Sequence, residues 1–336
     1  MKAAVFTKYG PPEVLQIDEV AKPVAKDNEV LVRIKATAVN SGDWRIRKAD
    51  PFAVRFMFGF TKPRTKILGS VFSGEVESVG KDVKLFKAGD PVFGHTDMHF
   101  GAYAEYISVP ENGSIAIKPA NISHTDAAVI PFGGVTALYF LRKAAIKQGQ
   151  KVIVVGASGA VGSAAVQLAK SFGAEVTGIC STANTGLVKS LGADKVVDYT
   201  KEDFTMNGEI YDVIFDTVNA INVSRSLKSL TENGVMILSA AGPAEMLQGA
   251  WVSMTGKKKI LTGVIKHTAE DILFLKGLIE TNRYKPIVDK AYSLGQIAEA
   301  HAYVEKGHKK GNVVIEVQHE ACPPESRRNT NTPAPL

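Results

Sequence analysis

The stretch Lys151-Val152-Ile153-Val154-Val155-Gly156-Ala157-Ser158-Gly159-Ala160-Val161-Gly162 decides the fold of this 336-residue chain. Its first five residues form a short apolar run, which is typical of a strand buried on both faces. After the glycines, Val161, Ala165 and Leu168 recur at helical spacing, and Gly173 stands where a helix would end. A strand, a glycine-rich turn and a helix in this order predict the phosphate-binding turn of a dinucleotide-binding domain.

The glycines of this turn have separate tasks. Gly156, Gly159 and Gly162 fit the spacing G-x-x-G-x-x-G. Gly159 lets the backbone approach a pyrophosphate, and Gly162 lets the helix pack against its strand. The start of the helix then offers free N–H groups to the phosphates.

The chain beyond this turn alternates between strand and helix patterns. We expect strands at 175–179, 213–215 and 235–238, with a helix at 187–191 that Gly192 closes. Such repetition predicts a parallel, doubly wound α/β sheet. Before the turn, residues 126–142 have helical spacing that Gly133-Gly134 is expected to interrupt.

The first 120 residues have a different pattern, rich in β-branched residues and punctuated by Gly, Pro and Asp. This part predicts a mostly antiparallel β-domain. Its expected strands lie at the N-terminus and at 29–36, 71–79, 91–93 and 102–109.

The C-terminal part returns to the first domain in our interpretation, with a helix at 297–306 and a strand at 312–317. We therefore expect one domain from 1–120 and 285–317 and a second from 121–284. Residues 318–336 are rich in Pro, Asn, Thr and charge, which predicts a disordered tail.

Composition excludes several classes of protein. Hydrophobic residues make up 45% and charged residues 22%, as in an ordinary globular enzyme. No apolar run approaches the roughly 20 residues of a membrane-spanning helix. Met1–Phe6 alternates like a strand rather than a signal peptide, so we expect a cytoplasmic protein.

Charge and cysteine content exclude further classes. The net charge of +6 is scattered, with one tight cluster at 257–259, so nucleic acid is not an expected partner. Cys180 and Cys322 stand far apart, which argues against a disulfide framework and a cysteine-rich zinc site.

The end of the second predicted parallel strand indicates which nicotinamide cofactor binds. A protein that prefers NAD places an acidic residue there, whereas here no acidic residue occurs between Glu175 and Asp194. A carboxylate there would repel a 2′-phosphate by roughly 4 kcal/mol at about 4 Å. Ser181 and Thr182 offer hydroxyl donors, and Lys189 either reaches the phosphate or stays solvated. The sequence predicts NADPH.

Several motifs in a fixed order now point to a family. From Met1 to about Val317, the chain resembles the zinc-independent quinone oxidoreductase branch of the medium-chain dehydrogenase/reductases, which includes zeta-crystallin-like proteins and enone reductases. The resemblance implies a GroES-like β-domain and a Rossmann domain around a cleft, and often a homodimer. Besides the glycine turn, the motifs are Val39-Asn40-Ser41-Gly42-Asp43-Trp44, Leu68-Gly69-Ser70-Val71-Phe72-Ser73-Gly74, Gly101-Ala102-Tyr103-Ala104-Glu105-Tyr106 and Gly133-Gly134-Val135-Thr136-Ala137.

The resemblance also implies the residues that contact the cofactor. Tyr199 matches a tyrosine near the 2′-phosphate, although it could instead be a loop aromatic that covers a helix. The expected contact residues are Thr136, Gly156, Ser158, Gly159, Ala160, Val161, Gly162, Ser181, Thr182, Tyr199, Ser239, Ala240, Ala241 and Gly242.

Zinc-dependent relatives carry a cysteine in the first motif and Gly-His-Glu in the second. Here these positions read Asn40 and Gly69-Ser70-Val71, and the four-cysteine structural site is missing as well. Neither zinc site could assemble from these side chains. Val71 also departs from the zinc-free branch, in which an acidic residue is common.

Without zinc to acidify an alcohol, the easier reaction is reduction of an electrophilic acceptor, either a quinone or an α,β-unsaturated carbonyl compound. The protein must then position the reactants and donate hydrogen bonds to the acceptor oxygen. Candidate catalytic residues are Asn40, Arg45 and Tyr103, with Arg47 also near the cleft. Asp43 is expected to orient a neighbour or cap a turn.

Other residues that could bind a metal, act as a nucleophile or cover the cleft have simpler structural interpretations. His95 and His99 flank Asp97, and two imidazoles in one loop are expected to form polar surface rather than a metal site. Ser158 lacks the setting of a hydrolase nucleophile. The phenylalanines of 52–60 could form an apolar lid, or they could be buried in the core or in a dimer contact.

Two further functions stay open at this point. The acceptor could be a 2-alkenal or an enoyl thioester, reduced by a protein with the same fold. The chain could also be a non-catalytic relative that binds NADPH, in which case no acceptor would be reduced.

Overall fold

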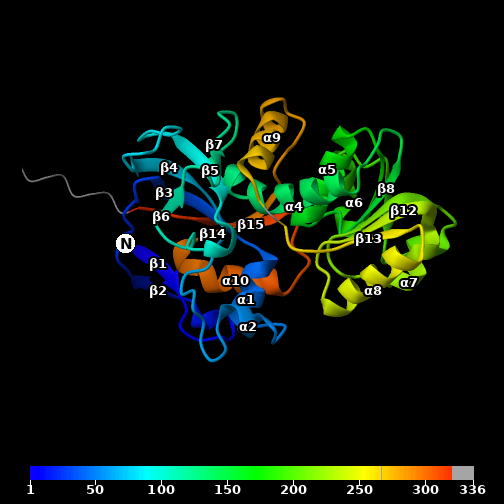
Figure 1. Cartoon of the computed structure of the whole chain (residues 1–336), viewed down its shortest axis with the longest axis horizontal. Coiled ribbons are helices and arrows are strands. Elements are labelled where there is room, and N and C mark those ends of the chain that lie inside the picture. The colour runs from blue at the N-terminus through cyan, green and yellow to red at the C-terminus, as the bar shows by residue number, and fades with distance from the viewer. Residues whose placement is uncertain (266, 320–336) are drawn as a thin grey trace, which may run out of the picture.

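The computed structural model describes residues 1–265 and 267–319. Figure 1 shows two lobes side by side, one rich in antiparallel strands and one built on a parallel sheet. No helix in these residues is both long and apolar enough to cross a membrane. The part of the predicted tail from residue 320 onward, with Cys322, lies outside the described residues. His319 is described, and its ring packs on Tyr106.

The β-rich lobe is built on a seven-stranded sheet in the order β14-β15-β3-β4-β5-β7, with β6 paired to β3. Apart from the parallel pair of β14 and β15, its neighbouring strands are antiparallel. Its elements are β1 (Lys2–Val5), β2 (Gln16–Glu19), β3 (Glu29–Val39), α1 (Ser41–Lys48), α2 (Val54–Phe58), β4 (Val71–Val79), β5 (Pro91–His95), β6 (Tyr106–Pro110), β7 (Ser114–Ile117), β14 (Val288–Ser293), α10 (Ile297–Glu305) and β15 (Asn312–Glu316).

The second lobe is built on six parallel strands in the order β10-β9-β8-β11-β12-β13. This lobe has the predicted Rossmann arrangement, because the chain winds outward from β8 in both directions. Its elements, with the helices that adjoin them, are α3 (His124–Ala128), α4 (Ile130–Lys143), β8 (Lys151–Val155), α5 (Ala160–Ser171), β9 (Glu175–Cys180), α6 (Thr185–Ser190), β10 (Lys195–Asp198), β11 (Tyr211–Asp216), α7 (Val223–Ser226), β12 (Leu230–Leu238), α8 (Pro243–Thr255), β13 (Lys259–Leu261) and α9 (Ala269–Glu280).

The predicted break at Gly133-Gly134 is wrong. Both glycines lie inside α4, and the chain breaks earlier, at Val129 between α3 and α4. A Cβ atom on Gly133 would lie 2.5 Å from the carbonyl oxygen of Ala160. The glycine therefore allows α4 to pack closely against the start of α5, the helix that follows the phosphate-binding turn.

The strand predicted at 102–109 is too long at its start. Only Tyr106–Pro110 forms β6, whereas Tyr103 and Ala104 belong to a loop that pairs briefly with β1. This loop carries Tyr103 into the buried core. Residue alternation alone did not distinguish this loop from a strand.

Candidate active site

A cleft with a volume of about 1240 Å³ lies between the two lobes. On the Rossmann side, its wall consists of the glycine turn after β8 and the residues that follow β9, β10 and β11. On the other side, the start of α1 and the loop at 307–310 face this wall. The cleft therefore lies at the carboxyl edge of the sheet, beside the switch point between β8 and β11, where open α/β sheets bind ligands.

The glycine turn leaves its backbone free for an anion. Gly156 has a φ of 76°, which suits glycine, and a Cβ atom on Gly162 would lie 2.0 Å from the carbonyl oxygen of Gly156. Gly159 caps α5 without a side chain, so the first N–H groups of that helix stay available to a phosphate. Gly311, which directly precedes β15, donates its N–H to the carbonyl of Ser158 at 2.7 Å. This hydrogen bond holds the glycine turn against the β-rich lobe.

The end of β9 forms the next part of the wall. Ser181 lines the cleft, as does Asn184, whose amide donates to Ser158 at 3.1 Å and to Ser181 at 3.3 Å. Thr182 is turned away, because its hydroxyl donates to Asp198 at the end of β10. Hydrogen bonds from Thr182 and Thr200 lower the pKa of Asp198 to about 2, so this carboxylate is charged at neutral pH.

Cationic side chains from separate parts of the chain also line the cleft. Lys201 follows β10, Arg225 belongs to α7, and Lys309 and Lys310 come from the loop before β15. Burial lowers the pKa of Lys309 to about 8, and its ammonium donates to the carbonyl of Gly311 beside the glycine turn. Sequence reasoning missed these four residues, although Lys201 could have been noticed because it comes just after a strand.

Asn40 forms the opposite wall at the start of α1. Its backbone N–H donates to the carboxylate of Asp43 at 2.8 Å, and burial raises the pKa of Asp43 to about 6. The side-chain amide nitrogen of Asn40 is buried and has no hydrogen-bond partner among the described residues. An unpaired buried donor is costly, so this atom suits a ligand oxygen in the cleft.

The other predicted catalytic residues lie in different settings. Arg45 lines the cleft, with its guanidinium 4.9 Å above the ring of Trp44. Tyr103 is fully buried behind the wall, and its hydroxyl donates to the carbonyl of Ala38 at 3.4 Å. Arg47 is also fully buried and pairs with Glu305. Of these three residues, only Arg45 can touch a ligand in the cleft as the structure stands.

The predicted cofactor residues divide into two groups. Those that line the cleft are Gly156, Ser158, Gly159, Ala160, Val161, Ser181, Tyr199 and Ala240. Those that do not line it are Thr136, Gly162, Thr182, Ser239, Ala241 and Gly242. Ser239, for example, donates its hydroxyl to the carbonyl of Asp216 at 3.2 Å.

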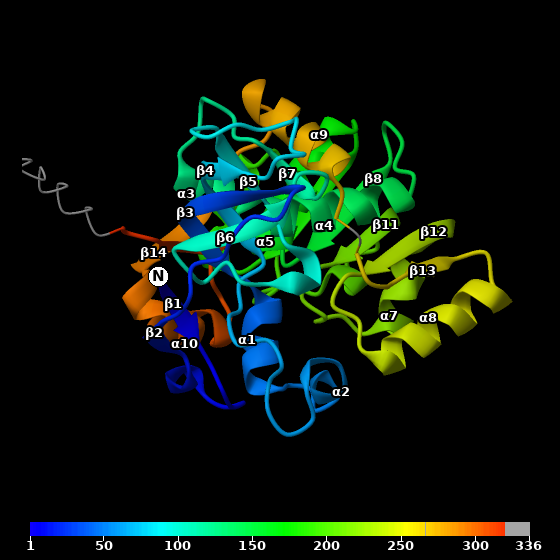
Figure 2. The ribbon, with the colours of Figure 1, turned by 60° about the vertical axis from the view of Figure 1, so that its left-hand side comes forward.

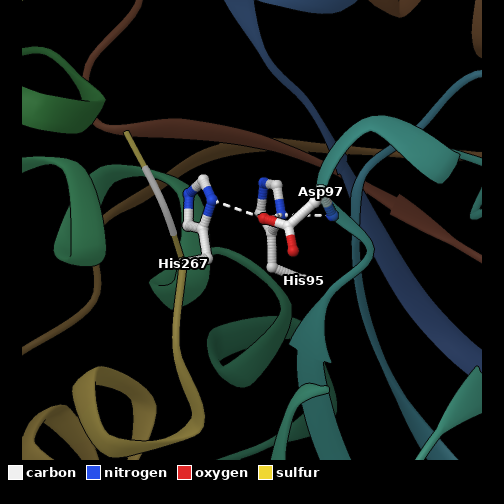
Figure 3. Close-up of side chains that lie close together, drawn as sticks. All are labelled: His95, Asp97 and His267. Atoms are coloured by element: carbon white, nitrogen blue, oxygen red, sulfur yellow. Dashed lines mark hydrogen bonds and ion pairs between the residues drawn. The ribbon is translucent and has the colours of Figure 1, made fainter. Parts of the chain in front are cut away.

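A separate group of side chains joins His95, the last residue of β5, and Asp97 to His267, which follows β13 (Figure 3). Asp97 lies 2.8 Å from Nδ1 of His267, and its backbone N–H donates to Nδ1 of His95. Burial lowers the pKa of His95 to about 4, so this ring is neutral at pH 7. The expected surface pair of His95 and His99 is wrong, because His95 is buried and its partner comes from 172 residues further along.

This group does not have the geometry of a metal centre. The rings of His95 and His267 are stacked, with centroids 3.7 Å apart and planes 11° from parallel. Imidazole lone pairs lie in the ring planes, so two parallel rings cannot both direct them at one ion about 2.0–2.1 Å away. The group instead links the end of β5 to the connection between β13 and α9.

The positions that hold the catalytic zinc ligands in zinc-dependent relatives do not suit a metal either. Asn40 offers an amide, the backbone carbonyl of Ser70 is occupied by hydrogen bonds from Thr96, and Val71 is fully buried. Zinc requires thiolate, imidazole or carboxylate ligands. The residues present therefore do not fit zinc at this wall.

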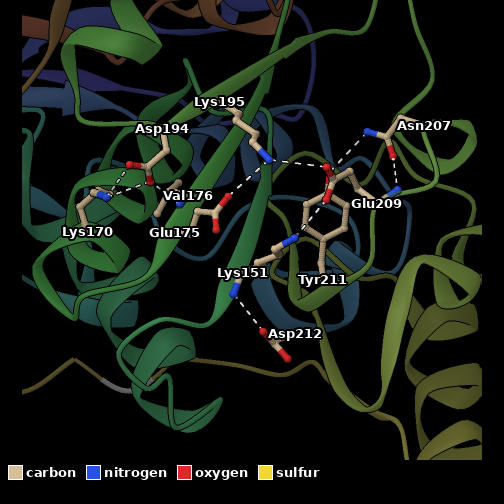
Figure 4. Close-up of polar contacts among 10 residues, drawn as sticks. All are labelled: Lys151, Lys170, Glu175, Val176, Asp194, Lys195, Asn207, Glu209, Tyr211 and Asp212. Atoms are coloured by element: carbon tan, nitrogen blue, oxygen red, sulfur yellow. Dashed lines mark hydrogen bonds and ion pairs between the residues drawn. The ribbon is translucent and has the colours of Figure 1, made fainter.

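A second polar cluster lies at the opposite, amino edge of the parallel sheet (Figure 4). Lys195 lies 3.4 Å from Glu175 and 3.5 Å from Glu209, and Lys151 lies 3.2 Å from Glu209. These side chains are 39–53% exposed. Solvent screens such pairs, so we interpret them as surface ion pairs.

The cleft, its glycine turn and the cations around it fit a phosphorylated dinucleotide. Together with the two lobes, they define a dinucleotide-dependent oxidoreductase built from a GroES-like β-domain and a Rossmann domain. Residues 26–119 match the alcohol dehydrogenase GroES-like domain, and residues 191–315 match the family described as zinc-binding dehydrogenase.

Comparisons with known proteins agree with this class. The chain is 35% identical to 2-methylene-furan-3-one reductase of Solanum lycopersicum, over 94% of the chain and 79% of that protein. It is 32% identical to the chloroplastic NADPH-dependent alkenal/one oxidoreductase of Arabidopsis thaliana, over 94% and 79%. The solved structure of Escherichia coli quinone oxidoreductase complexed with NADPH has a TM-score of 0.79 at 28% identity, covering 94% and 100% of the two chains.

The chain therefore belongs to the medium-chain dehydrogenase/reductase family, in the branch of quinone oxidoreductases and enone reductases.

Proposed function

We propose that this protein reduces α,β-unsaturated carbonyl compounds and quinones with NADPH and needs no metal ion. The observation that carries the proposal is the side-chain amide nitrogen of Asn40, which is buried and has no partner among the described residues. Asn40 lines the cleft at the position where zinc-dependent relatives hold a metal ligand. A donor fixed at this place can stabilise the negative charge that develops on the acceptor oxygen.

When bound, NADPH supplies a hydride, and the other tasks belong to residues of this chain. The N–H groups at the start of α5 hold the pyrophosphate. Ser181 and Tyr199 surround the 2′-phosphate. Lys201 and Arg225 lie in the same wall, where they pair with Asp198 and Asp203 until a phosphate binds. Asn40 donates to the acceptor oxygen, while Trp44 and Phe132 form apolar walls on the same side of the cleft.

Reduction of a quinone and reduction of an enone both require the protein to stabilise negative charge on the acceptor oxygen. In both, a hydride adds to an electrophilic carbon and leaves negative charge on a conjugated oxygen. Uptake of one proton from solvent, followed by tautomerisation, completes the reduction. The product of an enone is a saturated carbonyl compound, and the product of a quinone is a hydroquinone. Two relatives are named for alkenal or furanone reduction, which favours testing enones first.

The test is NADPH oxidation by the purified protein with panels of 2-alkenals, cyclic enones, enoyl thioesters and quinones, each with and without a chelator. We expect turnover with at least one panel and no effect of the chelator. Loss of activity with the chelator would contradict the metal-free reaction. NADPH binding without turnover of any acceptor would support a non-catalytic protein instead.

We further propose a homodimer that works in the cytoplasm and binds no nucleic acid. The strand β13 stands at the edge of the parallel sheet, beside the exposed side chains of Leu247 and Met254 on α8. An unpaired edge beside apolar side chains favours association with a second copy. Light scattering after size exclusion tests the oligomeric state, and microscopy of the tagged protein tests its location.

A further inference from the structure

The loop that carries α2 exposes four large apolar side chains. Phe52, Phe56, Met57 and Phe60 are 58%, 70%, 66% and 59% exposed, and we call them the phenylalanine patch. The three phenylalanine rings touch one another, with centroids 6.0–6.3 Å apart. A soluble surface rarely gathers aromatic rings in this way without a binding partner.

The loop packs against the β-rich lobe through its other side chains, so the phenylalanine patch has a defined orientation. Phe58 packs against Phe100 with ring centroids 5.7 Å apart, and the hydroxyl of Tyr9 donates to the carbonyl of Gly59 at 2.7 Å. The guanidinium of Arg55 lies 4.7 Å above the ring of Tyr9. These contacts use one side of the loop and leave the phenylalanine patch on the other.

The patch is not a wall of the active-site cleft. Among the described residues that line the cleft, none comes from 46–131. Figure 2 shows α2 on a loop that projects from the β-rich lobe below α1. Of the three alternatives that the sequence left open, burial in the core does not describe these four side chains, and none of them lines the cleft as a lid would. The third alternative, a dimer contact, is considered below.

The segment that carries the patch is rich in positive charge. From Arg45 to Lys66 the chain contains seven Lys and Arg residues and one acidic residue, Asp50. Two of the seven, Arg47 and Lys48, pair with Glu305. Lys62, Arg64 and Lys66 are exposed and form no ion pair with any residue in 1–265 or 267–319. The result is an aromatic surface beside several uncompensated cations.

We propose that the phenylalanine patch and these cations bind the surface of a membrane that contains anionic lipids. Aromatic and apolar side chains enter the boundary between headgroups and acyl chains, while Lys and Arg approach the lipid phosphates. A second copy of this chain fits less well, because a symmetric contact would bring the same cations face to face. This surface recognises lipid independently of the acceptor that the cleft reduces.

The test is co-sedimentation of the full chain with vesicles, either of phosphatidylcholine alone or with roughly one third phosphatidylglycerol. We expect binding to the anionic vesicles only, and weaker binding at high salt because salt screens the cations. The variant Phe56→Ser/Phe60→Ser should reduce partitioning by about tenfold or more, since each exposed ring contributes apolar area. Lys62→Gln/Arg64→Gln should reduce it by about threefold to tenfold.

The matched control is Leu85→Ser, a substitution of another exposed apolar side chain on the same lobe (67% exposed), which should bind as well as the wild type. NADPH binding and thermal melting verify that each variant is folded. Absence of binding to anionic vesicles overturns the proposal, and so does equal binding to both vesicle types. A dimer that dissociates in Phe56→Ser/Phe60→Ser would assign the surface to a second copy instead.

Discussion

At the scale of single residues, the cleft depends on how Asn40 is held. Its backbone N–H is fixed by the carboxylate of Asp43, which lies one helical turn further on and is buried beside Tyr103. The ring of Tyr103 in turn lies where a side chain on Gly69 would need to be. We therefore interpret Tyr103 and Asp43 as positioning residues for Asn40 rather than as groups that contact the substrate.

Replacement of Asn40 by alanine should lower kcat by about 10²- to 10³-fold, because one donor to a developing oxyanion has roughly this effect. The dissociation constant of NADPH should change little, since the amide serves the acceptor. Stopped-flow kinetics and fluorescence titration measure the two quantities. Ser41→Ala alters the next residue of the same wall and is the control. A variant that keeps wild-type kcat would remove Asn40 from the mechanism.

Ser181 determines the choice between the two nicotinamide cofactors in our interpretation, because it lines the cleft at the end of β9. Ser181→Asp should weaken NADPH binding by tenfold or more, since a carboxylate there repels the 2′-phosphate. NADH binding should hold or improve. Titration with both cofactors measures the shift, and Ser190→Asp, on the exposed end of α6, is the control. An equal loss of affinity for NADPH and NADH would indicate damage to the fold rather than an altered cofactor preference.

At the scale of elements, local patterns predicted the Rossmann strands well. The expected strands at 151–155 and 175–179 are β8 and β9, and Gly173 and Gly192 follow the ends of α5 and α6 with positive φ. Five strands of the two lobes were missed, namely β2, β7, β10, β13 and β14. Four of them have only three or four residues, and β14 has no fully buried residue, so the local pattern is too short or too weak to predict a strand.

Gly162→Ala should disrupt the junction between β8 and α5, because the new methyl group would meet the carbonyl oxygen of Gly156 at 2.0 Å. Backbone atoms cannot move aside as a flexible side chain can. We expect NADPH affinity to fall at least tenfold and the melting temperature to drop. Gly186→Ala is the matched control, since nothing lies within 4 Å of its Cβ position in α6. Gly186→Ala should leave the affinity for NADPH unchanged and stabilise α6 slightly.

At the scale of the whole molecule, the candidate site combines residues that sequence reasoning could not place together. Arg225 and Lys309 reach the cleft from α7 and from the segment that returns to the β-rich lobe. His267 meets His95 only because the connection after β13 crosses back toward β5. No local pattern carries this information, since the contacts depend on how the two lobes pack.

Packing between distant segments also buries histidines, and this gives the protein a pH dependence. Burial lowers the pKa of His301 to about 3 and that of His95 to about 4. The unfolded chain binds a proton at each ring near pH 6.5, while the folded chain does not. Stability must therefore fall as the pH decreases from 7 to 5, by roughly 1–2 kcal/mol for each ring. Asp43 has the opposite effect, because its pKa is raised to about 6 in the folded chain. The folded chain binds a proton there between pH 7 and pH 5, which stabilises it by about 1 kcal/mol.

Replacement of His301 by glutamine should remove its share of this pH dependence. Glutamine cannot be protonated, yet its carbonyl can accept the hydrogen bond that Nε of Arg47 donates to His301 at 3.3 Å. Between pH 7 and pH 5, the variant should lose roughly 1–2 kcal/mol less stability than the wild type. Urea denaturation at both pH values measures this, with His99→Gln, at an exposed ring, as the control. If both variants lose as much free energy of unfolding between pH 7 and pH 5 as the wild type does, His301 is not held neutral by burial.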